Sequence, residues 1–182
     1  MVICIRNDRL KSNRKIKINV KNQILNIFFP ICILSIALQF LNSWPRWDSA
    51  AYYLSLENLD ILNILRSAAD GLIVCGHPTS AYALLVFLFR SIPGVSNLNA
   101  LYLSSLFLII LDYYLIYFIF KKIFTLRSDF IYSILAFIFI CSPYILGNIA
   151  NINPEHLCLT GLLMFILGSL IKNHYLCTIA CY

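Results

Sequence analysis

Charged residues are scarce in this sequence. Only 12% of its 182 residues are charged, and 60% are hydrophobic. A soluble domain has about one quarter charged residues and close to half apolar ones, so the composition excludes an ordinary water-soluble domain. A helix needs about 20 apolar residues to cross a bilayer core about 30 Å thick, so the length allows four or five crossings and one sizeable loop. We therefore expect an all-α fold, that of a polytopic membrane protein with about four transmembrane helices.

Paired cysteine motifs are missing as well. The seven cysteines form no C-x-x-C pair and have no metal-type spacing to the three histidines. They are most simply small apolar residues, so they indicate neither a metal site nor a redox compartment. They are Cys4, Cys32, Cys75, Cys141, Cys158, Cys177 and Cys181.

Acidic residues are few, and the basic ones are unevenly placed. A basic segment just before a hydrophobic run is the usual positive-inside signal, which we favour here over nucleic-acid binding. The segment also suits contact with anionic lipid headgroups. It is too long for a removed signal peptide, and the run after it lacks a small-residue cleavage site. Half of the 14 basic residues lie in this segment, at Arg6, Arg9, Lys11, Arg14, Lys15, Lys17 and Lys21.

We accordingly divide the chain into a basic cytoplasmic tail, residues 1–22, and a transmembrane domain, residues 23–182. The tail and the first apolar run form a retained signal anchor. The expected location is integral to a membrane, most simply a bacterial plasma membrane, with the N-terminus in the cytoplasm.

Four apolar runs are candidates for the crossings. They cover residues 24–41, 101–120, 130–146 and 157–171. The basic residues Lys121, Lys122, Arg127 and Lys172 follow the second and fourth runs, as the positive-inside rule requires if these ends face the cytoplasm. Residues 42–98 then form an external loop of short interfacial helices, and residues 147–156 form a second external loop.

Residues 81–89, AYALLVFLF, are the ambiguous segment. Nine helical residues cover only about 14 Å, against a core of about 30 Å. If the segment crossed the membrane, Lys121 and Lys122 would lie outside while the basic tail stayed inside. We therefore expect an interfacial or re-entrant helix. This choice places Asp48 and Glu155 on the same outer face.

Three short motifs occur in order between residues 24 and 172. The aromatic residues around the first motif suit the membrane interface, where Asp48 could equally cap a helix that begins at Ser49. The motifs are Asp48 with Ser49, Tyr52 and Tyr53; His77-Pro78-Thr79-Ser80-Ala81-Tyr82; and Ser142-Pro143 followed by Asn153-Pro154-Glu155.

In this order the motifs resemble those of the membrane glycosyltransferases of the GT-C superfamily. The resemblance is to the protein mannosyltransferase and aminoarabinose transferase branch, which is family 39-like. The sequence departs from that pattern in having Ser49 after the first acid, H-P-T in place of H-P-P, and Glu155 where an aspartate is frequent.

The resemblance implies transfer of a sugar from a polyprenyl-phosphate carrier to a hydroxyl acceptor. Asp48 would take the acceptor's proton. Arg46 and His77 would stabilise the phosphate that leaves, although His77 could equally cap the short helix. Tyr52 would contact the substrate, and Glu155 would orient the acceptor or assist a divalent ion. No metal is assigned, because few oxygen donors are visible.

The expected partners are a lipid-linked sugar donor and membrane lipids, with no nucleic acid. The family's core has more crossings than this chain. We therefore expect the sequence to be an N-terminal fragment with little or no transferase activity by itself.

Asp112 lies in the middle of the second apolar run, where an isolated charge is costly. We expect it to face the bundle, protonated or bonded to a tyrosine, in a structural role. It lies about 17 Å along the helix from the outer end, so we exclude it from the outer site. A competing class is a non-enzymatic membrane protein, such as a transporter fragment or an assembly subunit. Asp112 favours that class, whereas the two outer acids oppose it.

Overall fold

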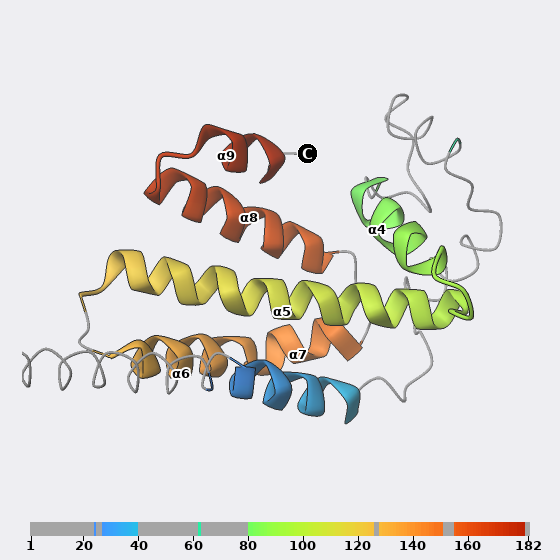
Figure 1. Ribbon diagram of the computed structural model, residues 1–182, viewed down its shortest axis with the longest axis horizontal. Helices are drawn as coiled ribbons and strands as arrows, with labels where there is room; N and C mark the ends of the chain where they lie inside the picture. The colour runs from blue at the N-terminus through green and yellow to red at the C-terminus, as the bar shows by residue number, and fades with distance from the viewer. Residues whose placement is uncertain are drawn as a thin grey trace, which may run out of the picture.

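The computed structural model describes residues 27–39, 80–125, 128–150 and 155–180, together with Ile24 and Leu62. All regular secondary structure in these residues is helical, which confirms the predicted all-α fold over the described ranges. The helices are an unlabelled one, Ile27–Gln39, followed by α4 (Ser80–Arg90), α5 (Asn97–Ile123), α6 (Asp129–Ile140), α7 (Pro143–Ala150), α8 (Glu155–Leu170) and α9 (His174–Ala180) (Figure 1).

The longest described helix, α5, runs through the centre of the bundle (Figure 1). Its 27 residues extend about 40 Å, more than the thickness of a bilayer core. Ser96 begins the helix by accepting a hydrogen bond from the Asn99 backbone N–H at 3.2 Å. Lys121 and Lys122 occupy its last turn, where positive charge is favourable. Among the described residues, α5 is the one helix that is long and apolar enough to cross a membrane.

The third apolar run is broken in two. Its first part, α6, ends at Ile140, and α7 begins at Pro143 after two intervening residues. Proline has no backbone N–H, and it disfavours a helical conformation in the residue before it. The backbone N–H groups of Cys141 and Ser142 still find acceptors, at 2.9 Å on Phe137 and 3.2 Å on Phe139. The expected single crossing at 130–146 is therefore a pair of helices arranged nearly end to end (Figure 1).

Three helices share one end of the bundle. The end of α5 meets the start of α6 through an ion pair of 2.9 Å between Lys121 Nζ and Asp129 Oδ1. The helix Ile27–Gln39 runs alongside α6, since the Phe29 ring lies 5.3 Å from that of Phe137. The helix α6 therefore begins where α5 ends, whereas Ile27–Gln39 begins beside the later part of α6 (Figure 1). We call this the lysine end, and α8 ends on the same side (Figure 1).

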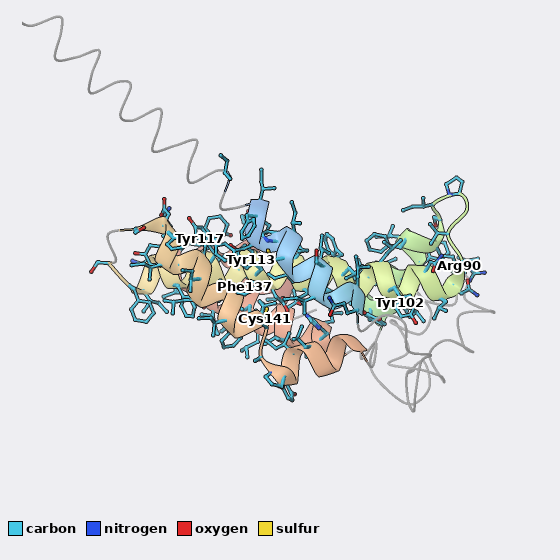
Figure 2. The ribbon with its side chains drawn as sticks, turned by 90° about the horizontal axis from the view of Figure 1, so that it is seen from below. Arg90, Tyr102, Tyr113, Tyr117, Phe137 and Cys141 are labelled. Atoms are coloured by element: carbon cyan, nitrogen blue, oxygen red, sulfur yellow. The ribbon has the colours of Figure 1, made fainter. Side chains whose placement is uncertain are left out.

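Neighbours of α5 differ along its length. The short helix α4 packs beside its N-terminal half, and α8 packs beside its C-terminal half (Figure 1). Figure 2 shows Tyr113 and Tyr117 of α5 near Phe137 of α6. Arg90 and Tyr102 lie far from them, toward the end of the bundle opposite the lysine end, which we call the α4 end. The buried core therefore has two parts, one on each half of α5.

A tight turn at Lys172 connects α8 to α9. Lys172 has a φ of 56°, and the Asn173 backbone N–H donates to the Gly168 carbonyl at 2.8 Å. This is the bonding pattern that ends a helix with one left-handed residue. It folds α9 back against α8 so closely that a Cβ on Gly168 would lie 2.9 Å from Cys177 Sγ and 3.1 Å from its backbone nitrogen.

We predict that Gly168→Ala lowers the melting temperature of the detergent-solubilised chain, because the added methyl group forces α9 away from α8 at a cost of about 1–3 kcal/mol. Gly147→Ala is the matched control. A Cβ at Gly147 meets no atom within 4 Å, so alanine in this helix should stabilise by about 0.5–1 kcal/mol. Equal melting temperatures for the two variants would contradict the α8–α9 packing.

Candidate functional site

Asp112 is a fully buried carboxylate on an otherwise apolar stretch of α5. Its exposed fraction is 0%. Two buried serines lie N-terminal to it on the same helix, Ser104 and Ser105. The Ser104 hydroxyl is satisfied locally, because it donates to the Ala100 carbonyl at 2.8 Å. Asp112 has no such local solution, since a carboxylate cannot donate to its own helix, and it needs a partner from another element.

That partner is His156, the second residue of α8. His156 Nε2 lies 2.8 Å from Asp112 Oδ2, and the two side chains are 2% and 0% exposed. One proton lies between these atoms, either on the imidazole, which then donates to the carboxylate, or on the carboxylic acid, which then donates to the imidazole. Burying either group alone would cost several kcal/mol, and pairing offsets much of that cost.

The other carboxylate oxygen, Asp112 Oδ1, is buried and has no hydrogen-bond partner among the described residues. The bond to His156 is therefore the one directional contact that this carboxylate makes within that part of the chain. One turn further along α8, the Thr160 hydroxyl donates to the His156 carbonyl at 3.2 Å. The His156 side chain thus bonds the first turn of α8 to α5, and the His156 carbonyl accepts a hydrogen bond from within α8.

Apolar packing borders the pair on the side of α4. Tyr82 and Val86 of α4 form a buried cluster with Leu101 and Leu108 of α5. Leu157, the residue after His156, packs against this cluster. The beginning of α8 therefore borders the apolar cluster that α4 and α5 form, and the Asp112–His156 pair lies one turn further along α5 than Leu108 of that cluster.

Most of the residues predicted for the outer site lie outside the described residues. This applies to Asp48, Arg46, Tyr52 and His77. Glu155 is the first residue of α8, and its side chain also lies outside the described part of the structure. Their predicted roles stay predictions.

The prediction for Asp112 was right in one respect and wrong in another. It faces the bundle, as expected. Its partner is a histidine rather than a tyrosine, because α8 brings His156 Nε2 to 2.8 Å from Asp112 Oδ2. The sequence signal for this pairing was a histidine at the start of an apolar run, because a carboxylate inside an apolar helix requires a polar partner from another helix.

The separation drawn between Asp112 and the region of Glu155 was also too large. Asp112 was excluded from the outer site because it lies well along α5 from the outer end of that helix. However, α8 begins beside the middle of α5 rather than at its end, since His156 is bonded to Asp112. The Glu155 backbone is therefore one residue away from the partner of Asp112.

The described residues contain no group of three or more histidine, cysteine, aspartate or glutamate side chains that could hold a metal ion. Comparison of the chain with protein-family models, with curated proteins and with solved structures gave no match. The functional inference therefore rests on the residues of this chain and their geometry.

We predict that Asp112→Leu and His156→Leu each destabilise the chain by about 3–5 kcal/mol, because each leaves one buried polar partner without the other. The double variant Asp112→Leu/His156→Leu should recover most of this loss, since neither polar group then remains buried. Thermal unfolding in detergent measures the cycle. Ser104→Ala is the control and should change stability little, because its hydroxyl bonds only within α5. Additive losses in the double variant would contradict the pairing.

Proposed function

We propose that this chain is a polytopic membrane protein and forms part of a glycosyltransferase site. The reaction is transfer of a sugar from a polyprenyl-phosphate carrier to a hydroxyl acceptor on the non-cytoplasmic face. One observation carries this proposal. The helix α4 is too short to carry the chain across the bundle. The long segment between Gln39 and α5 therefore begins and ends on the same side of the bundle.

The length of α4 supports this arrangement. Its 11 residues extend only about 16 Å, roughly half of a bilayer core. The turn at Ser91–Gly94 then leads directly into α5. The helix Ile27–Gln39 runs toward the α4 end, where α5 begins (Figure 1). The segment that contains Asp48 and His77 is thus anchored at both of its ends on one side of the bundle.

Charge supports the orientation. Lys121 and Lys122 lie at the end of α5, and Lys172 follows α8 on the same side. The basic N-terminal segment leads into Ile27–Gln39, which starts near the middle of the bundle and runs away from the lysine end (Figure 1). By the positive-inside rule the lysine end faces the cytoplasm, and the α4 end faces the opposite compartment.

The proposed chemistry assigns one task to each residue. Asp48 accepts the proton of the acceptor hydroxyl as its oxygen attacks the anomeric carbon of the sugar, and the bond from that carbon to the carrier phosphate breaks. Arg46 and His77 stabilise the negative charge of the departing lipid phosphate. Tyr52 contacts the substrate. Glu155, at the first turn of α8, orients the acceptor.

A second candidate function is a non-enzymatic transporter or assembly subunit. The buried Asp112–His156 pair favours it, because ionisable groups inside a membrane bundle commonly mark the path of an ion or a proton. A transporter needs this pair to change its contacts during transport. The glycosyltransferase needs the outer acids instead, so variants of Asp48 and of Asp112 separate the two candidates.

We predict saturable capture of a photoreactive polyprenyl-phosphate sugar by the purified chain in nanodiscs. Arg46→Ala should weaken this binding about tenfold or more, because a charge-assisted bond to phosphate contributes about 1.5–3 kcal/mol. Lys172→Ala, a basic residue at the lysine end, is the matched control and should leave the affinity unchanged. Absence of saturable capture, or an equal loss with Lys172→Ala, would count against the proposal.

We also predict sided labelling of single cysteines placed in a cysteine-free chain in intact membranes. Ser49→Cys and Ser91→Cys should react from the non-cytoplasmic side, whereas Asn173→Cys should react from the cytoplasmic side. Ser91 and Asn173 are exposed residues of turns. The side of the membrane on which each lies, rather than burial within the protein, therefore determines whether it is labelled. Labelling of Ser91→Cys and Asn173→Cys from the same side would refute the topology.

A further inference from the structure

The Asp112–His156 pair is buried, with no lysine or arginine paired to it in the described part of the chain. The carboxylate is 0% exposed and the imidazole 2%. Asp112 forms its ion pair with His156, whereas Lys121 forms one with Asp129 at 2.9 Å. Lys121 is nine positions beyond Asp112 on α5, which is about 13 Å along the helix. The charge of the buried pair is therefore not balanced by a fixed cation from these residues.

That charge depends on how many protons the pair holds. With one proton between Nε2 of His156 and Oδ2 of Asp112, the imidazole and the carboxylate together carry a net charge of −1. A second proton, on His156 Nδ1 or on Asp112 Oδ1, makes the pair neutral. A net charge in apolar surroundings is costly, whereas a neutral hydrogen-bonded pair is tolerated there. The neutral state is thus the one that suits the buried site.

The free oxygen of the carboxylate indicates which ion the site can take. Asp112 Oδ1 is buried and has no hydrogen-bond partner among the described residues. A calcium ion takes about six to eight oxygen ligands, but the same residues contain no group of three histidine, cysteine, aspartate or glutamate side chains. The nearby Thr160 hydroxyl already donates to the His156 carbonyl. A proton needs only one acceptor atom, and the pair provides that.

From this geometry we infer that the Asp112–His156 pair is a proton-binding site that exchanges one proton with the surrounding solution. Uptake takes the proton from a hydronium ion, leaves water, and changes the charge of the pair from −1 to 0, and release reverses these changes. The inference goes beyond the proposed transferase function and does not rest on it. For the transporter candidate, it specifies a proton rather than a metal ion.

The other titratable groups around the pair are phenols or lie away from it. Within the described residues, every other buried titratable side chain is a tyrosine, and a phenol ordinarily titrates at about pH 10. These are Tyr82 of α4, Tyr113 and Tyr117 of α5, and Tyr132 of α6. The described charged side chains lie toward the two ends of the bundle, at Arg90, Lys121, Lys122, Asp129 and Lys172. On α7, α8 and α9 the titratable side chains are exposed or half-buried, at Tyr144, Cys158, His174, Tyr175 and Cys177.

Infrared difference spectroscopy of the whole chain in nanodiscs tests the inference. Spectra are compared between about pH 5 and about pH 8, the range in which an imidazole ordinarily titrates. The background is His77→Gln/His174→Gln, which leaves His156 as the one imidazole of the three in the sequence. Asp112→Asn removes the acid while its amide can still donate to His156 Nε2. Asp129→Asn is the matched control, because it removes the other carboxylate whose side chain the structure describes.

We expect a pH-dependent change in the carboxylic acid C=O band or in the imidazole ring bands of the parent chain. Asp112→Asn should lose this change, and Asp129→Asn should keep it. A pH-indicator dye should report about one more proton taken up per parent chain than per Asp112→Asn chain, and this proton belongs to the pair as a unit.

Two results would overturn the inference. Spectra of the folded parent chain that show no change at either group over this range would mean a fixed structural contact. A midpoint that shifts when sodium or calcium replaces a large organic cation at equal ionic strength would mean a metal-ion site instead. Because no sugar donor is present, neither result bears on the proposed transferase function.

Discussion

The arrangement of α5 and α8 depends on one buried hydrogen bond, between the Asp112 carboxylate and the His156 imidazole at 2.8 Å. A carboxylate with no exposed surface on an apolar helix is tolerated only when another element supplies a partner. Because that partner lies in the first turn of α8, the bond determines where along α5 the helix begins. It also places Glu155 beside the middle of α5, since residues 155 and 156 share one turn.

Helix length is the second constraint. At 11 residues, α4 is too short to extend across a bilayer core. It instead packs on the N-terminal half of α5 through a separate buried cluster that includes Tyr82 and Val86. The bundle is consequently divided along α5, with α4 on one half and α6 and α8 on the other (Figure 1). The Asp112–His156 pair lies at the junction of these halves.

These two constraints connect the fold to the proposed function. The α4 end gathers the helix α4 and the start of α5, and Ile27–Gln39 runs toward it, while lysines collect at the opposite end. The proposed site at the α4 end takes its acidic residue Asp48 from the segment before α4, whereas α8 begins deeper in the bundle, beside the middle of α5.

Much of this molecule could be predicted from the sequence by itself. Low charge, long apolar runs and basic residues at alternate ends determined the helical class, the approximate helix positions and the shortness of α4, because these features depend on local composition and length. The break between α6 and α7 also has a local cause, the proline at position 143, although its effect on the predicted run was missed. The pairing of Asp112 with His156, 44 positions apart, could not be predicted, because periodicity places a residue on a helix face but does not specify how far two helices are shifted along each other. Only the tertiary structure decided that shift, since it depends on how α8 packs along α5.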